Sequence, residues 1–268
     1  MDHLPTIITK DVQYGIAKVT TLLCFLYSYL LVLASHKFRN LYFKEAPILK
    51  DPEIGNRVGD LITQQAALCM LSVVITFSLH AFKEMERDMA IGVGILPWFI
   101  WTSHGLLNEE CYKSVNSSPR TLYINLVFFG LVAYSSLTDQ PYASLVNKVL
   151  AGFGLANGLL CYLMPTSLGK VYDIPNREDF LMLSRRSFGN CLTALSVFLG
   201  ALSFGTSDLH AVGYCWVSYG FGLVLLLAEF KQHKGNMAKI AVWIIAAVFH
   251  GTIFLIDLKP KSTSNSGE

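Results

Sequence analysis

Residues 209–228 read LHAVGYCWVSYGFGLVLLLA, twenty residues without a single Lys, Arg, Asp or Glu. At a rise of about 1.5 Å per residue, a helix of this length spans about 30 Å, the thickness of the hydrocarbon core of a bilayer. A soluble helix of the same length would carry a polar face. The stretch therefore predicts a transmembrane helix, and the rest of the chain is interpreted from it.

Seven further apolar stretches resemble this one in length and are separated from it and from each other by polar or turn-rich pieces. Hydrophobic residues make up 53% of the 268 residues and charged residues only 15%, which is typical of a membrane protein. We predict an all-α polytopic bundle that forms a single integral membrane domain over residues 1–268. The eight predicted spans are Val19–Ser35, Leu61–Leu79, Met89–Leu107, Leu122–Leu137, Val149–Met164, Phe188–Phe204, Leu209–Ala228 and Ile240–Leu258.

Several functional classes are disfavoured by composition and by missing motifs. The net charge of +2 is too small for a nucleic-acid-binding protein. No histidine cluster, paired aspartate motif or phosphate-binding loop is present, so we expect neither a metal nor another cofactor. Five of the six cysteines lie inside apolar stretches, where a thiol behaves as a small hydrophobe, and we expect no disulfide framework.

The distribution of basic residues predicts the orientation of the bundle. The odd-numbered connections carry fourteen Lys and Arg residues, and the even-numbered connections with the two termini carry seven. Because positive charge favours the cytosolic side, we expect the odd-numbered loops to face the cytosol. Thr138–Pro141 has the composition of a tight turn between the fourth and fifth spans.

The chain also contains signs of an internal duplication. Ala90-Ile91-Gly92 aligns with Ala211-Val212-Gly213 at a separation of 121 residues, and Trp98 then pairs with Tyr219. An even number of spans per unit makes the two copies parallel. We predict two four-helix repeats, over 19–137 and 149–258.

Ionisable residues near membrane depth are the candidates for catalysis. A carboxyl group in hydrocarbon is favoured in its neutral form and can donate a proton, although acids at span ends are also reached by headgroups and water. His250 also belongs to the ionisable set, but without an assigned role. The predicted catalytic residues are Glu229, Asp60, Asp257, Glu109 and His104, with Glu229 first because it follows a long apolar run.

Aromatic and amide side chains inside the spans are the candidates for substrate binding. Aromatic faces stabilise cations, whereas Trp and Tyr at span ends serve as interfacial anchors, the interpretation favoured for Trp243. Amides line a ligand site or join helices. The predicted substrate-binding residues are Trp98, Trp101, Tyr214, Trp216, Tyr219, Asn157 and Asn190.

In length, number of spans, aromatic-rich helices and acids at span ends, the chain resembles the fungal membrane-bound terpene cyclases of meroterpenoid biosynthesis, of the ascochlorin and macrophorin type. The resemblance implies a metal-free, acid-initiated cyclisation of a farnesyl-type chain in the endoplasmic reticulum membrane. The partners would then be an apolar isoprenoid substrate and the lipid bilayer. The alternative is a small multi-pass transporter or accessory membrane subunit, since parallel repeats are common in transporters. The oligomeric state is left open.

Overall fold

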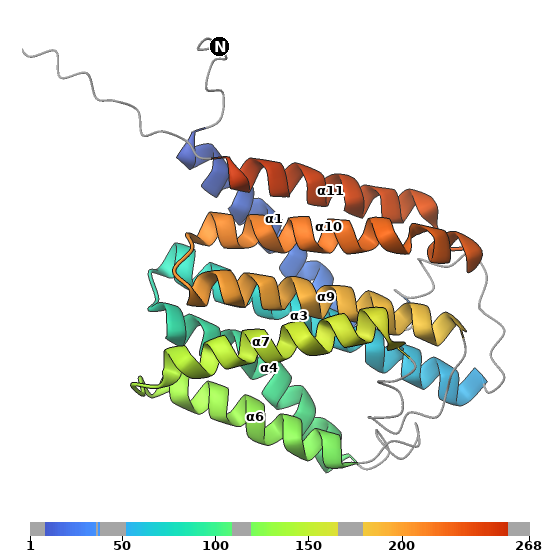
Figure 1. Ribbon diagram of the computed structural model, residues 1–268, viewed down its shortest axis with the longest axis horizontal. Helices are drawn as coiled ribbons and strands as arrows, with labels where there is room; N and C mark the ends of the chain where they lie inside the picture. The colour runs from blue at the N-terminus through green and yellow to red at the C-terminus, as the bar shows by residue number, and fades with distance from the viewer. Residues whose placement is uncertain (1–8, 36, 38–51, 109–118, 166–178, 257–268) are drawn as a thin grey trace, which may run out of the picture.

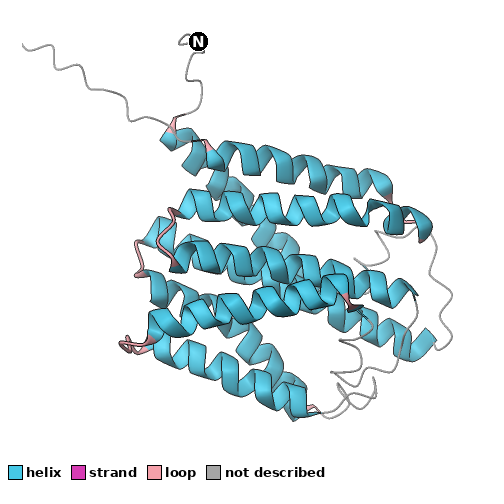
Figure 2. Ribbon diagram, viewed as in Figure 1, coloured by secondary structure: helices cyan, strands magenta, loops and turns pink. Residues whose placement is uncertain are grey.

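The computed structural model describes residues 9–35, 37, 52–108, 119–165 and 179–256. This part of the chain forms eight long helices and no strand (Figure 2). Each helix contains most or all of one predicted span, so the all-α prediction is confirmed. The helices are α1 (Lys10–Leu33), α3 (Pro52–Lys83), α4 (Arg87–Leu107), α6 (Pro119–Leu137), α7 (Ala143–Leu163), α9 (Asp179–Ser203), α10 (Asp208–Gln232) and α11 (Met237–Leu255).

The helices lie roughly side by side and alternate in direction (Figure 1). In that view α11, α10, α9, α7 and α6 form one layer, with α1, α3 and α4 behind it. The connections 84–86, 138–142 and 204–207 lie at one end of the bundle, together with the start of α1 and the end of α11. The predicted turn at Thr138–Pro141 is present, with Asp139 in the left-handed region at φ 50°.

Within the described residues, six helices are long and apolar enough to cross a membrane: α1, α3 from Gly59 onward, α4, α7, α10 and α11. Helix α6 has a shorter apolar stretch, Leu122–Leu137. Helix α9 is less apolar, but it contacts α3, α7 and α10, so much of its surface faces protein rather than lipid. The chain is a helical membrane bundle in which α9 is an inner helix.

The two halves of the chain pack their helices in the same pairs. In the first half α1 contacts α3, α3 contacts α4 and α4 contacts α6; in the second half α7 contacts α9, α9 contacts α10 and α10 contacts α11. Helices α3 and α9 meet at the centre. This is the arrangement that a parallel pseudo-two-fold axis produces, although the duplication of the sequence itself stays a prediction.

Two pairs of residues illustrate this correspondence. Gly92 and Gly213, 121 residues apart, both lie where the helix crosses its successor: an added Cβ would lie 2.7 Å from Ser136 in α6 and 2.8 Å from Leu255 in α11. Near the start of α1, buried Gln13 donates to the carbonyl of Ile253 at 2.7 Å. Near the start of α7, buried Asn147 accepts from Ser136 at 3.2 Å.

A polar cluster joins α3 and α10 at the end of the bundle that carries the short turns. Nε2 of His80 lies 3.1 Å from Oδ1 of Asp208, and Nδ1 of the same ring lies 2.8 Å from the carbonyl oxygen of Met85. Asn147 donates to Asp88 at 2.7 Å in the same region. These contacts fix the turn between α3 and α4 against the starts of α7 and α10.

Candidate functional site

Helix α1 has a narrow face toward the protein and a broad face toward lipid. Its buried residues recur at helical spacing: Gln13, Ala17, Cys24, Ser28 and Leu31. On the other side Val19, Leu22 and Leu23 are 61%, 60% and 61% exposed. Exposed aliphatic surface of this extent on a helix long and apolar enough to cross a membrane indicates a lipid-facing surface.

Helix α11 presents a similar lipid-facing surface, and a groove runs between the two helices. Val242, Ile245 and Val248 of α11 are 64%, 67% and 62% exposed. The groove has a volume of about 680 Å³, within the range of small-molecule sites. Its lining comes from α1 (Gly15, Ile16, Val19, Thr20, Leu23, Cys24 and Tyr27), α10 (Trp216) and α11 (Trp243, Ala246, Phe249 and His250).

Aromatic rings form the wall of the groove around Trp216. The indole of Trp216 stacks on the imidazole of His250, with ring centroids 4.8 Å apart and planes 23° apart. Trp243 lies 6.5 Å from Trp216 in a stacked orientation and 5.0 Å from Tyr27. Rings from α1, α10 and α11 therefore meet at one place.

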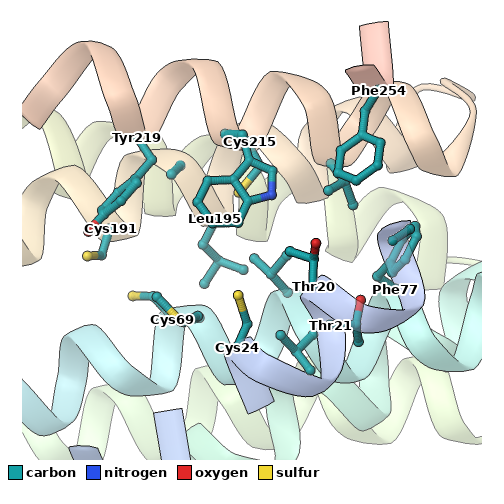
Figure 3. A pocket seen from close by; sticks show the side chains of 17 residues that line it. Thr20, Thr21, Cys24, Cys69, Phe77, Cys191, Leu195, Cys215, Tyr219 and Phe254 are labelled. Carbon is teal, nitrogen blue, oxygen red and sulfur yellow. The ribbon is translucent and has the colours of Figure 1, made fainter. Parts of the chain in front are cut away.

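A smaller cavity continues from the groove into the bundle (Figure 3). It shares Thr20, Cys24 and Trp216 with the groove, and it has a volume of about 70 Å³. It is therefore much smaller than the groove. Four thiols line it, from α1 (Cys24), α3 (Cys69), α9 (Cys191) and α10 (Cys215), and all are free.

The corresponding helices in the other half of the molecule pack closely on each other. There α7 packs closely on α9, because a Cβ added to Gly158 would lie 2.8 Å from the backbone nitrogen of Thr193. At the separation of 134 residues that relates Gln13 to Asn147, Gly158 corresponds to Cys24 and Gly154 to Thr20. The larger side chains of Thr20 and Cys24 do not permit α1 to approach α3 as closely as α7 approaches α9.

Aromatic side chains also occupy the region between α6 and α7. Phe128 of α6 packs against Phe153 of α7 with ring centroids 5.1 Å apart. On its other side, α6 packs Phe129 against Trp98 of α4 at 5.5 Å. The short turn at 138–142 also joins these two helices directly.

His250 and Thr20 form a hydrogen bond across the groove from α11 to α1. Nε2 of His250 lies 2.8 Å from Oγ1 of Thr20, and Nδ1 lies 2.7 Å from the carbonyl oxygen of Ala246, one turn earlier. A carbonyl oxygen only accepts, so Nδ1 carries a proton. In the neutral ring Nε2 then accepts the hydroxyl proton of Thr20.

The predicted catalytic residues lie away from this groove or outside the described residues. Glu229 forms an ion pair with Arg186 of α9, and the two side chains are 29% and 33% exposed. Asp60 is half-buried in the first part of α3, and His104 is exposed in the last turn of α4. None of these three lines the groove or the inner cavity. Glu109 and Asp257 lie outside the described residues.

The predicted substrate-binding residues divide between the groove and the packing of the bundle. Trp216 lines the groove and the inner cavity, Tyr219 lines the cavity, and the buried side chain of Asn190 donates to the carbonyl of Tyr219 at 2.9 Å. Tyr214 is 46% exposed and lines neither space.

The other three predicted binding residues make contacts elsewhere. Trp98 is buried in the main core. Trp101 donates to the side-chain oxygen of Gln64 at 3.3 Å, and Asn157 donates to the carbonyl of Phe153 in its own helix at 2.8 Å. Sequence reasoning missed the groove residues Thr20 and Tyr27, gave His250 no role and interpreted Trp243 as an interfacial anchor.

The chain matches no protein-family model, no curated protein and no solved structure.

Proposed function

We propose that the groove between α1 and α11 binds an apolar prenyl chain drawn from the bilayer, and that the protein cyclises it without a metal. The observation that carries the proposal is a groove of about 680 Å³ with aromatic walls, set between two helices whose outer faces lie in hydrocarbon. An isoprenoid substrate dissolved in the membrane reaches such a groove from the side, without passing through water.

The chemistry of a cyclisation fits the wall of this groove. A cyclising polyene carries positive charge from carbon to carbon, and the faces of Trp216, Trp243 and Tyr27 stabilise a nearby cation, by about 0.5–2 kcal/mol for each ring. Water would quench the cation, and an apolar lining excludes it. Both requirements are met by the same set of side chains.

The cyclisation needs an acid that donates the first proton. Among the predicted acids, Asp257 lies closest in sequence to α11, whose side chains line the groove. It follows Ile256 directly, and the carbonyl of Ile256 accepts a hydrogen bond from Gln13 at 3.1 Å. Glu229 is a weaker candidate, because its carboxylate is paired with Arg186. The proposal therefore assigns the donor role to Asp257. The proposal includes the endoplasmic reticulum membrane, which the resemblance to the terpene cyclases implies. It also includes odd-numbered loops in the cytosol, the side that the distribution of Lys and Arg favours.

A paired substitution on α10 tests the proposal. Microsomes that contain the protein would be supplied with a farnesylated phenol or its terminal epoxide, without added Mg²⁺, and analysed for a cyclised isomer of unchanged mass. We expect Trp216→Leu to reduce the product at least tenfold, because it removes a ring from the groove wall. The matched control is Tyr214→Leu on the same helix, which should form product at the wild-type rate. Equal activity in both variants, or no isomer from the wild type, would remove the proposal.

A further inference from the structure

The hydrogen bond between His250 and Thr20 leaves the hydroxyl oxygen of Thr20, which lines the groove, able to accept a further hydrogen bond. Because the Thr20 proton is donated to Nε2 of His250, the hydroxyl oxygen keeps its lone pairs and acts as an acceptor. The ring is itself oriented by the carbonyl of Ala246 and by its stacking on Trp216. A molecule in the groove therefore meets a fixed acceptor at Thr20.

The depth of this acceptor restricts the chemical class of the group that it binds. Thr20 lies about 15 Å from the start of α1 and about 20 Å from its end, at a rise of about 1.5 Å per residue. A charged headgroup at this depth would pay a large desolvation cost. A neutral donor such as an alcohol or a phenol does not, and it would extend the chain of bonds from Ala246 through His250 and Thr20.

The other half of the molecule lacks this pair, although it has the structural bonds of the repeat. Gln13 has a counterpart in Asn147, but Thr20 corresponds to Gly154. Gly92 contacts Ser136 and Leu137 of α6, and Gly213 contacts Phe254 and Leu255 of α11. Pairing these contacts relates α6 to α11 at a separation of 118 residues, at which His250 corresponds to Val132. The pair thus belongs to the groove and not to the packing that the halves share.

We propose that Thr20, oriented by His250, recognises the neutral hydroxyl group of an oxygenated isoprenoid in the groove. This inference rests on the proposed function and narrows its ligand to an alcohol or phenol that donates a hydrogen bond within the hydrocarbon core.

Binding of two matched probes to the full chain in lipid nanodiscs tests the inference. Farnesol carries the hydroxyl donor, and farnesyl methyl ether has the same chain without it. We expect the wild type to bind farnesol about three- to tenfold more tightly than the ether, the effect of one hydrogen bond. Thr20→Val, which keeps the shape of the side chain, should bind both probes with the affinity of the ether. Thr20→Ser should restore the preference.

The outcomes separate this inference from the function on which it rests. Equal affinity of the wild type for both probes, or a preference that persists in Thr20→Val, would overturn the recognition role and leave an apolar groove. Failure of the wild type to bind either probe would overturn the proposed function and this inference together.

Discussion

Two glycines of α7 show how single positions hold this bundle together. A Cβ at Gly158 would lie 2.8 Å from the backbone nitrogen of Thr193 and 3.0 Å from the carbonyl oxygen of Gly189, whereas a Cβ at Gly152 would meet nothing within 4 Å. Backbone atoms cannot move aside as a flexible side chain can. Gly158 is therefore a contact point between α7 and α9, and Gly152 faces outward.

We expect Gly158→Ala to lower the free energy of unfolding by about 1–3 kcal/mol, the usual cost of overpacking. Gly152→Ala should leave it unchanged or raise it by about 0.5–1 kcal/mol, because alanine is the better helix former. Unfolding in mixed micelles by titration with a denaturing detergent measures both variants. Equal effects of the two substitutions would contradict the close packing of α7 on α9.

The sequence analysis placed Glu229 first among the candidate catalytic acids, but its ion pair with Arg186 supports a structural role. We expect Glu229→Gln to cost on the order of 1 kcal/mol of stability, because the pair is only partly exposed. Product formation should survive. In a double-mutant cycle, Arg186→Gln should cost less in the Glu229→Gln background than in the wild type. Strict additivity, or loss of product from a stably folded Glu229→Gln variant, would contradict this assignment.

At the scale of elements, α9 differs from its neighbours because its surroundings are protein. Its first turns carry Arg185 and Arg186, and each Arg at the centre of an isolated span costs about 2.5–3.5 kcal/mol on the insertion scale, with less near the ends. Buried Arg185 donates to the carbonyl of Pro165 at 3.4 Å. The bundle thus supplies the contacts that lipid does not.

We therefore expect α9 to insert poorly by itself. In a host protein that reports insertion by glycosylation of flanking sites, the isolated segment 179–203 should insert in a minority of molecules, and the segment 237–255 of α11 in nearly all. Replacing Arg185 and Arg186 by Leu should raise insertion of the α9 segment. Efficient insertion of the unmodified α9 segment would show that it needs no partner helices.

The elements were predictable from the sequence, whereas the groove was not. Apolar length and turn composition located the eight helices of the described residues, because both signals are local. On α1 the positions Ile16, Thr20 and Tyr27 share a helical face, as do Trp243 and His250 on α11, but nothing in either helix shows that these two faces meet. The first helix and the last helix are not joined by a turn, so only tertiary contacts such as the bond from Gln13 to Ile253 bring them together. Such contacts are seen only in the folded structure.

The residues of the candidate site were also predictable only where a local signal marked them. Trp216 and Tyr219 were identified by aromatic content alone, a property that Tyr214 shares although it faces outward. The acids were chosen by their distance from span ends, which does not reveal a partner on another helix such as Arg186.

At the scale of the whole molecule, the alternating helices place the turns 138–142 and 233–236 at opposite ends of the bundle. With the odd-numbered loops in the cytosol, a cysteine at Asp139 should be labelled by an impermeant maleimide from the lumenal side only. A cysteine at Lys234 should be labelled from the cytosolic side only. Both residues are exposed, and Cys111 would be replaced by Ser to remove background. The reverse pattern would invert the orientation, and labelling of both positions from one side would contradict the topology.

The central claim is that a prenyl chain occupies the groove between α1 and α11. The most direct measurement is photolabelling in nanodiscs with a farnesyl probe that carries a diazirine, followed by mapping of the labelled peptides. We expect labelling to concentrate on 15–27 of α1 and 243–250 of α11 and to be displaced by excess farnesol. The lipid-facing surface of α6, at 123–134, provides the internal comparison. Labelling spread evenly over both regions and unaffected by farnesol would contradict the claim.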